Sequence, residues 1–349
     1  MRVLKAFPHR LQPGFLVLFV ALGVLALVAA PVISQEGWRE VRLKSSEATK
    51  PHKRHEHAFV EVGGKLYALG GRRIQPVDIY DPISQEWAYG RKPPLELHHF
   101  QALAFKNKVL VAGAFTGKFP EETPVECIYF YDVLSDSWSE GPRIPEDRRR
   151  GSAGAFLKEG KLYLVCGLTD GHRSGWVAWF DEYDFETKKW RKLPDAPRAR
   201  DHFHAVLVGE QLVLAGGRRS GFGGEVFRDV IAEVDVFDFS RGVWKTLPSP
   251  QGDLPTPRAG ASSLVINEQV FVIGGETARK EAHVELEALD LASETWRSFL
   301  SLPGGRHASQ PAVWERTLYL QAGSIKRGGK ETRSLIACPF DALAEPVEK

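Results

Sequence analysis

Short, mostly apolar segments, separated by polar or glycine-rich turns, fill the chain after residue 35. Residues 58–62 and 65–69 form one such pair, with the turn Gly63-Gly64 between them. Two short apolar segments on either side of a glycine turn are typical of a β-hairpin. Long stretches with helical spacing of apolar residues are missing from the same part of the sequence. The pattern therefore predicts an all-β fold built from many short strands.

This pattern repeats along the chain, and tryptophan marks the period. Intervals of 51, 52, 54 and 52 residues separate Trp87, Trp138, Trp190, Trp244 and Trp296. Seven residues before each Trp stands a Tyr, Phe or Leu, and an Asp follows that residue in all five units. Each unit also has a pair of small residues such as Gly70-Gly71. Sixteen residues before that pair, five of the six units have an arginine: Arg54, Arg150, Arg200, Arg258 and Arg306. A repeat of this length is typical of a β-propeller, in which each unit is one blade.

Each unit has the markers of four strands, which we name a to d. Strand a follows the arginine, strand b ends on the small pair, strand c carries the aromatic residue with its Asp, and strand d carries the Trp. The sixth unit reaches strand c at Phe340-Asp341, with Pro339 as a discordant residue, but it has no Trp near position 347. Trp38, in residues 37–41, belongs to no earlier unit. We therefore predict that residues 35–349 form a six-bladed propeller with four-stranded blades, in which the N-terminal strand closes the last blade.

Residues 1–34 differ from the rest of the chain. Arg2, Lys5 and Arg10 precede an apolar run from residue 15 to residue 30. A basic start followed by such a run is typical of an export signal, which is either cleaved or kept as an anchor. We expect a periplasmic or secreted propeller after cleavage before Gln35. If the signal is not cleaved, we expect an extracytoplasmic domain that contacts the membrane only through residues 14–33.

Charge and cysteine content narrow the possible partners. Because residues 1–34 hold three basic residues and no acidic one, the remainder has 43 basic and 44 acidic residues. A domain without excess positive charge is not expected to bind nucleic acid. Cys127, Cys166 and Cys338 lie far apart in strand-like segments. We expect buried thiols, and a Cys127–Cys166 disulfide is the alternative.

The arginine, the double glycine, the Tyr-Asp pair and the Trp together resemble the kelch repeat, over residues 37–341. The resemblance implies the kelch propeller fold. It also implies that the turns before strand a, here called a-turns, and the loops between strands b and c, here called bc loops, share one face around the pore. Kelch propellers include adaptor modules, sugar-acid mutarotases and copper radical oxidases, so the family leaves the function open. No cysteine of this chain falls in a pore-facing turn, so it does not resemble the copper oxidases beyond the repeat.

The a-turns are rich in arginine and histidine, and most of the eleven histidines lie in them. Convergent polar side chains in a concave face are typical of a ligand site. The predicted ligand-binding residues are Arg54, Glu56, His57, His99, Arg150, Arg200, Asp201, His202, His204, Arg258, Arg306 and His307. The arginines also fit a structural role, because they belong to the repeat and are able to bond carbonyl groups of neighbouring blades.

The bc loops add basic residues to the same face: Arg72-Arg73, His172-Arg173, Arg218-Arg219, Lys326-Arg327 and Lys330. Guanidinium groups bind carboxylate or phosphate in a bidentate manner, which favours an anionic ligand. A rim of solvated charges is the alternative. Three aromatic residues in or beside the bc loops are able to stack on a sugar ring: Trp176, Trp179 and Phe222.

Histidines and a carboxylate in neighbouring a-turns raise the question of a metal. His202 and His204 alternate along a predicted strand, and Glu56 and His99 take the equivalent turn position in other blades. Such side chains suit zinc, copper or iron, but the residues come from different blades and form no linear motif. We therefore predict no metal and no cofactor.

Three functions follow from this sequence. The first is an exported module that binds an anionic sugar, a glycan or an acidic peptide at the pore mouth. The second is an enzyme resembling the sialic-acid mutarotases, in which Glu56 or a histidine performs acid–base chemistry and arginines hold a carboxylate. The third is a scaffold for protein–protein interaction. Convergence of Glu56, His99, His202 and His204 on one pocket favours the enzyme over the others.

Overall fold

The computed structural model describes residues 37–45, 48–221 and 227–347. The predicted export signal, residues 1–34, lies outside this part of the chain. Within the described residues, no helix has the length and apolar character needed to span a membrane.

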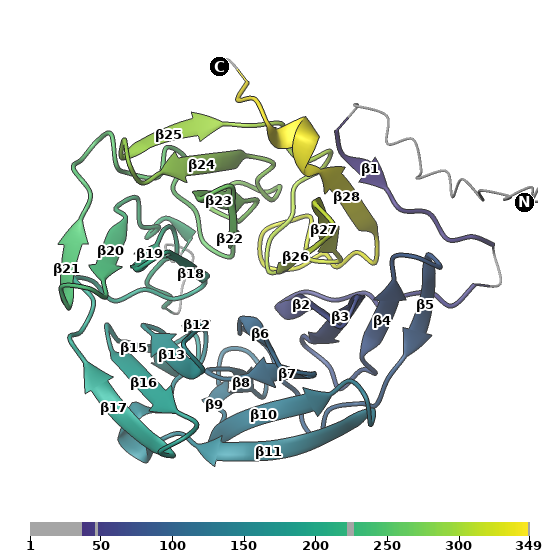
Figure 1. Ribbon diagram of the computed structural model, residues 1–349, viewed down its shortest axis with the longest axis horizontal. Helices are drawn as coiled ribbons and strands as arrows, with labels where there is room; N and C mark the ends of the chain where they lie inside the picture. Colours follow the sequence, from purple (N-terminus) through teal and green to yellow (C-terminus); the bar gives the residue numbers. More distant parts are fainter. Residues whose placement is uncertain (1–36, 46–47, 222–226, 348–349) are drawn as a thin grey trace, which may run out of the picture. The chain divides into compact units, whose positions relative to one another are not determined.

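Six four-stranded antiparallel sheets follow one another around a common axis, as Figure 1 shows. From the axis outwards, blade one contains β2 (His57–Val62), β3 (Lys65–Gly70), β4 (Asp78–Asp81) and β5 (Glu86–Tyr89). Blade two contains β6 (Ala102–Phe105), β7 (Lys108–Val111), β10 (Cys127–Asp132) and β11 (Ser137–Arg143). Blade three contains β12 (Gly154–Lys158), β13 (Lys161–Val165), β16 (Phe180–Asp184) and β17 (Lys189–Leu193).

The other three blades have the same order. Blade four contains β18 (Ala205–Val208), β19 (Gln211–Leu214), β20 (Asp235–Asp238) and β21 (Val243–Thr246). Blade five contains β22 (Ser262–Ile266), β23 (Gln269–Ile273), β24 (Leu286–Asp290) and β25 (Thr295–Ser298). Blade six contains β26 (Pro311–Trp314), β27 (Thr317–Gln321), β28 (Leu335–Pro339) and β1 (Arg39–Glu40). The six-bladed propeller predicted from the repeat is confirmed.

Two small hairpins extend from the bc loops of blades two and three. They are formed by β8 (Phe115–Thr116) with β9 (Thr123–Pro124), and by β14 (Leu168–Asp170) with β15 (Ser174–Trp176). The described residues also form two short 3-10 helices, Glu146–Arg148 and Phe340–Leu343. The hairpins matter for function because their tips contribute to the pore mouth described below.

The N-terminal strand closes the ring, as predicted. Arg39 pairs with Ala337 and Glu40 with Ile336, so β1 covers the outer edge of β28. Pro339 is the last residue of β28 and lies beyond the stretch that β1 covers, so its missing N–H interrupts no pairing with that strand. Strand c is shorter than predicted, because a 3-10 helix begins at Phe340.

The same hydrogen bond between neighbouring blades recurs at most of the repeated tryptophans. The indole Nε1–H of Trp38 donates to the Leu300 carbonyl at 3.1 Å, across the contact between blades six and five. Four other blades repeat this bond at 2.8–3.0 Å, through Trp138, Trp190, Trp244 and Trp296. Each of these side chains therefore packs on the preceding blade.

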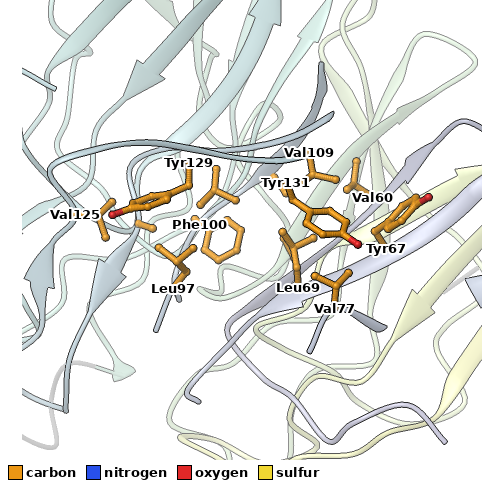
Figure 2. Close-up of a cluster of buried hydrophobic side chains, with 14 of the residues drawn as sticks. Val60, Tyr67, Leu69, Val77, Leu97, Phe100, Val109, Val125, Tyr129 and Tyr131 are labelled. Carbon is orange, nitrogen blue, oxygen red and sulfur yellow. The ribbon is translucent and has the colours of Figure 1, made fainter. Parts of the chain in front are cut away.

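The core is divided into six apolar clusters, and each cluster joins two consecutive blades. Figure 2 shows the cluster between blades one and two, where Tyr131 of β10 lies against Leu69 of β3. The rings of Tyr67 and Tyr131 are 6.1 Å apart. Because every cluster needs both of its blades, the ring folds as one unit and holds the central turns in place.

All three cysteines lie in the described part of the chain and are free and buried. The Cys127–Cys166 disulfide left open by the sequence is not formed. Burial raises the pKa of the Cys166 thiol to about 12, so this thiol is protonated and unreactive at neutral pH.

Replacing Trp38 with alanine is expected to lower the free energy of unfolding by about 2 kcal/mol, because the half-buried indole packs on blade five. Urea denaturation followed by circular dichroism measures the change. Ile83→Ala is the control, since Ile83 is 81% exposed in a turn, and it should unfold at the midpoint of the parent. Equal midpoints for the two variants would contradict closure of the ring through Trp38.

Candidate functional site

The six a-turns meet around the axis in a closed chain of hydrogen bonds, which we call the girdle. One residue of each turn takes part, and all six have φ angles between 52° and 59°: Glu56, His99, Ser152, His202, Gly260 and Ala308. The N–H of each donates to the corresponding residue of the preceding blade at 2.6–3.0 Å, to its carbonyl in five cases and to Ser152 Oγ in the sixth.

Left-handed backbone is unfavourable for residues other than glycine, by roughly 1–2 kcal/mol each. It persists in this case because the closed chain of hydrogen bonds over-determines the turn. The girdle thus fixes the side chains of Glu56, His99 and His202 around the axis.

A cavity of about 460 Å³, which we call the mouth cavity, opens beside the girdle. All six blades contribute to its wall, which consists of His55, Glu56, Arg72, Glu96, Gly117, Lys118, Phe119, His172, Arg218, Gly221, Phe227, Glu276 and Gly328. A smaller cavity of about 40 Å³ is lined by girdle residues and by residues that follow them, among them His57 and His204. Of these two cavities, the mouth cavity is the one large enough for a small-molecule ligand.

Charges in the mouth cavity are balanced. Arg72 pairs with Glu56 and, at 2.8 Å, with Glu122, and Arg218 pairs with Glu276 at 2.7 Å. Burial opposes ionisation of Glu276, but the charges of His307 and Arg218 outweigh it and hold the pKa at about 2. The wall has three cationic side chains, the third being Lys118, and three carboxylates, so the predicted excess of cations is not found in this cavity.

Three buried histidine rings stand against one another at the edge of the mouth cavity. The centroids of His99, His172 and His202 are 4.8–5.0 Å apart, and the rings are steeply inclined to one another. One nitrogen of each ring lies within 4.8 Å of a nitrogen of each of the others. Nε2 of His172 and Nε2 of His202 are separated by 3.2 Å.

Carboxylates lie next to all three rings. Asp201 contacts Nδ1 of His202, and Glu122 Oε1 lies 3.0 Å from Nδ1 of His172. Glu56 Oε1 is 2.7 Å from Nε2 of His99. Burial lowers the pKa of His202 to about 4, assisted by the charge of Arg218 and opposed by Asp201. The His202 imidazole is therefore neutral at pH 7, in the form that binds metal ions.

The predicted histidines and acids divide into two groups. Glu56, His99, Asp201 and His202 converge at the girdle. His57 and His204 line the smaller cavity together with Glu56, His99 and His202. His307 is not part of that lining, and its Nε2 donates to the Lys326 carbonyl at 2.8 Å. The expectation that His202 and His204 alternate along a strand is wrong, because both precede β18 and His202 takes a left-handed turn conformation.

The repeated arginines are engaged inside their own blades. Arg200 donates to the Gly216 carbonyl at 2.8 Å and to Asp235 at 2.6 Å, and neither charged side chain is exposed. Equivalent buried pairs are Arg54 with Asp78, Arg150 with Asp181, and Arg258 with Glu287. Arg306, which is half-buried, donates to Ser334 Oγ at 2.8 Å. The sequence left two roles open for the arginines, ligand binding and structural support. These positions favour structural support.

Several residues of the site were not among the predicted ones. His172 had been counted only as a basic residue of a bc loop, and His98 and Glu122 had no predicted role. The signal in the sequence is loop length: 15 residues separate β7 from β10, against seven between β3 and β4. Such an insertion has room for a hairpin that returns to the axis.

The aromatic residues of the mouth also differ from those predicted. The Trp179 ring packs on the Arg148 guanidinium at 4.3 Å and does not line the mouth cavity. Trp176 bonds the Ser220 carbonyl and likewise lies outside the cavity wall, and Phe222 lies outside the described residues. Phe119 and Phe227 are the aromatic residues of the wall.

Comparisons with known proteins agree with this geometry. The Kelch motif matches residues 257–299, which hold blade five. Kelch-like protein terF of Aspergillus terreus is 28% identical over 300 residues, which is 80% of this chain and 63% of that protein. Kelch-like protein 25 of Xenopus tropicalis is 26% identical over 270 residues, or 74% of this chain and 42% of that protein. The chain thus spans less than two thirds of the length of either relative.

Among solved structures, the one described as the structure of YjhT superposes with a TM-score of 0.67 at 14% sequence identity, over 83% of this chain and 96% of that one. At this identity the likeness concerns the fold alone. The repeat, the six closed blades and these matches together define a class of protein, the six-bladed β-propellers. Within that class the chain belongs to the kelch-repeat family.

Proposed function

We propose that the protein is an exported kelch propeller that binds a small, hydroxyl-rich ligand of the carbohydrate class in the mouth cavity. The observation that carries this proposal is a charge-balanced cavity of about 460 Å³ to which all six blades contribute. Small-molecule sites usually occupy about 300–1,000 Å³ and combine apolar walls with a few convergent polar groups.

The balance of charges favours a neutral ligand over an anion. A carboxylate in the cavity would meet guanidinium groups that already pair with Glu56, Glu122 and Glu276. Each hydroxyl of a sugar is both donor and acceptor, so one sugar is able to use Arg218 and Glu276 together. Sugar acids and acidic peptides are therefore the weaker candidates within the same proposal.

Aromatic side chains give the cavity a stacking surface. Phe119 is 61% exposed at the rim, and its ring lies 5.2 Å from that of His172. The ring of Phe227 faces the guanidinium groups of Arg218 and Arg327 at 5.2 and 5.1 Å. Exposed aromatic faces next to charged groups suit the apolar face and the hydroxyl edge of a sugar ring.

Export is part of the proposal and rests on the sequence of residues 1–34. Such a signal delivers the propeller to the periplasm or the medium, or leaves it anchored through residues 14–33. The mass of the protein recovered from outside the cytoplasm of its host tests this, with a chain that begins at Gln35 as the expected product. Recovery of the full-length protein from the cytoplasm alone would contradict it.

An enzyme of the sugar-acid mutarotase or epimerase type is the second candidate. The observation that favours it is the convergence of Glu56, His99 and His202, which line the smaller cavity together with His204. Glu56 and His55 both line the mouth cavity and are able to exchange protons with a bound sugar. Anomer exchange followed by NMR separates the two, since a binding protein leaves the exchange rate unchanged and an enzyme accelerates it.

Replacing Phe119 with alanine is expected to weaken saccharide binding about fivefold to tenfold, because it removes a stacking surface of the cavity wall. Calorimetric titration against a panel of neutral and acidic monosaccharides and disaccharides measures the affinity. Leu134→Ala is the matched control, because Leu134 is 80% exposed and is not part of the cavity wall. Equal affinities of both variants, or saturable binding of a partner protein and of no saccharide, would contradict the proposal and favour the scaffold function.

A further inference from the structure

We propose that His99, His172 and His202 bind one divalent metal ion of the zinc type at the edge of the mouth cavity, each through Nε2. This inference goes beyond the proposed function and does not depend on it. It rests on the positions of the three rings, on the hydrogen bonds that fix their tautomers, and on the carboxylates around them.

The spacing of the rings fits a metal centre. Zinc binds histidine nitrogen at about 2.0–2.1 Å in tetrahedral geometry, which places two such nitrogens about 3.4 Å apart. Nε2 of His172 and Nε2 of His202 are 3.2 Å apart. The third ring completes a triangle, with centroid distances of 4.8 and 4.9 Å to the first two.

A chain of hydrogen bonds fixes the tautomer of His99. His98 Nε2 lies 3.1 Å from the Gly117 carbonyl, which only accepts, so His98 carries its proton on Nε2. The Nδ1 atoms of His98 and His99 are 2.6 Å apart, so His99 Nδ1 donates to the free lone pair of buried His98. His99 Nε2 is then left with a lone pair, which faces Glu56 Oε1 at 2.7 Å.

Carboxylates favour the same tautomer at the other two histidines. Asp201 accepts from Nδ1 of His202, and Glu122 lies 3.0 Å from Nδ1 of His172. These acids are themselves held: Asp201 accepts from Ser220 N at 2.8 Å, and Arg72 contacts Glu122 at 2.8 Å. Metal-binding histidines usually have such a partner on the other ring nitrogen, because it orients the ring and raises its basicity.

Nε2 lone pairs of three buried rings therefore converge. The 3.2 Å contact between Nε2 of His172 and Nε2 of His202 requires either a proton or a metal cation between the two nitrogens. A second close contact of this kind joins His99 Nε2 to Glu56 Oε1 at 2.7 Å, so Glu56 stands beside the site as a possible further ligand. Imidazole nitrogen with carboxylate oxygen is a donor set for zinc and its neighbours in the first transition row.

The location of the site gives the ion a route to solvent and to a ligand. His172 and Glu56 both line the mouth cavity, whereas His99 and His202 lie deeper, in the girdle. Three protein nitrogens leave a coordination position open, as in catalytic zinc sites. A hydroxyl group or water in the mouth cavity is therefore within reach of that position.

Titration of the chelator-treated protein with Zn²⁺ alone tests the inference. The chain is used as its host processes it, stripped with EDTA and dialysed, and binding is followed by calorimetry. We expect one equivalent of Zn²⁺ per chain, and with Co²⁺ in its place the visible d–d absorption of a low-symmetry centre. No saccharide is added, so a failure of this test and a failure of saccharide binding are separate results.

Substitutions test whether the bound Zn²⁺ ion lies at the three histidines. His172→Gln removes a ligand from a hairpin outside the girdle and is expected to weaken Zn²⁺ binding at least about 100-fold. Glu122→Gln keeps all three ligands and is expected to weaken it about 10–100-fold. His283→Gln is the matched control, because His283 is buried and pairs with Glu285 at 2.9 Å but belongs to no cluster of possible metal ligands among the described residues.

Three outcomes decide the matter. The site is supported if His172→Gln no longer binds the equivalent of Zn²⁺, if Glu122→Gln binds it more weakly, and if His283→Gln binds it as the parent does. Absence of bound Zn²⁺ in the folded parent protein overturns it. Parent-like affinity in both His172→Gln and Glu122→Gln, each folded by circular dichroism, also overturns it, since the ion would then be bound elsewhere.

Discussion

Replacing Asp235 with alanine should lower the free energy of unfolding by about 3–5 kcal/mol, because it leaves a buried guanidinium without its counter-charge. Asp235 Oδ2 lies 2.6 Å from Nη2 of Arg200, and both side chains are fully buried. The other carboxylate oxygen accepts from Arg198 at 2.5 Å and from Thr246 Oγ1 at 2.7 Å. Asp235, on strand c of blade four, thus neutralises the charge of Arg200, which precedes strand a of the same blade.

Equilibrium urea denaturation of the parent and the variant measures this loss. The matched control is Asp341→Ala, which removes a carboxylate from a pair of similar length, 3.0 Å from Arg316. Asp341 is 83% exposed, so solvent already screens the pair and the control should be close to the parent. If the two substitutions had the same small effect, the buried ion pairs of the repeated arginines would not stabilise the blades.

Replacing Tyr131 with alanine is expected to cost about 3–5 kcal/mol, because a fully buried aromatic ring leaves a hole between blades one and two. Its neighbours there include Leu69 and Val77 of blade one (Figure 2). Tyr131→Phe keeps the ring and removes only the hydrogen bond from the hydroxyl to Asp136, which is 2.7 Å long. We expect this variant to lose about 1 kcal/mol.

Thermal and urea unfolding of the two variants give the comparison. The account predicts a large loss for alanine and a small one for phenylalanine, with single transitions in both, because the six clusters couple the blades. A separate early transition for blades one and two in Tyr131→Ala would contradict the view that the ring unfolds as one unit.

The fold was predictable because its markers are local in sequence and repeated in space. Four of the repeated tryptophans, Trp138, Trp190, Trp244 and Trp296, make the same bond to a preceding blade, so their spacing reports the blade period directly. Trp38 obeys the same rule at a distance of 262 residues from Leu300. That is why one unpaired tryptophan near the N-terminus was enough to predict how the ring closes.

The site was less predictable, because its side chains come from elements whose conformation the repeat does not encode. His172 and Glu122 reach the axis only through hairpins in two long bc loops. The alternation of His202 and His204 suggested a strand, but both residues precede β18 and His202 takes a left-handed turn conformation. Cationic residues were visible in the sequence, whereas their pairing with Glu56, Glu122 and Glu276 depends on contacts between different blades.

The girdle connects the propeller fold with the candidate site. Its hydrogen bonds form only when all six blades are in place, and they hold Glu56, His99 and His202 in a backbone conformation that none would favour alone. Rigidly held side chains of this kind lower the entropic cost of binding a ligand or an ion, since they are already ordered before binding. In the proposed function, the charges that pair across the mouth cavity select among the ligands.

A crystal structure of the protein with a saccharide that binds in solution tests the central claim most directly. The account predicts density for the sugar in the mouth cavity, with its ring against Phe119 or Phe227 and its hydroxyls on Arg218 and Glu276. Density for the sugar at the outer strands of the blades, with the mouth cavity free of it at a saturating concentration, would contradict the account.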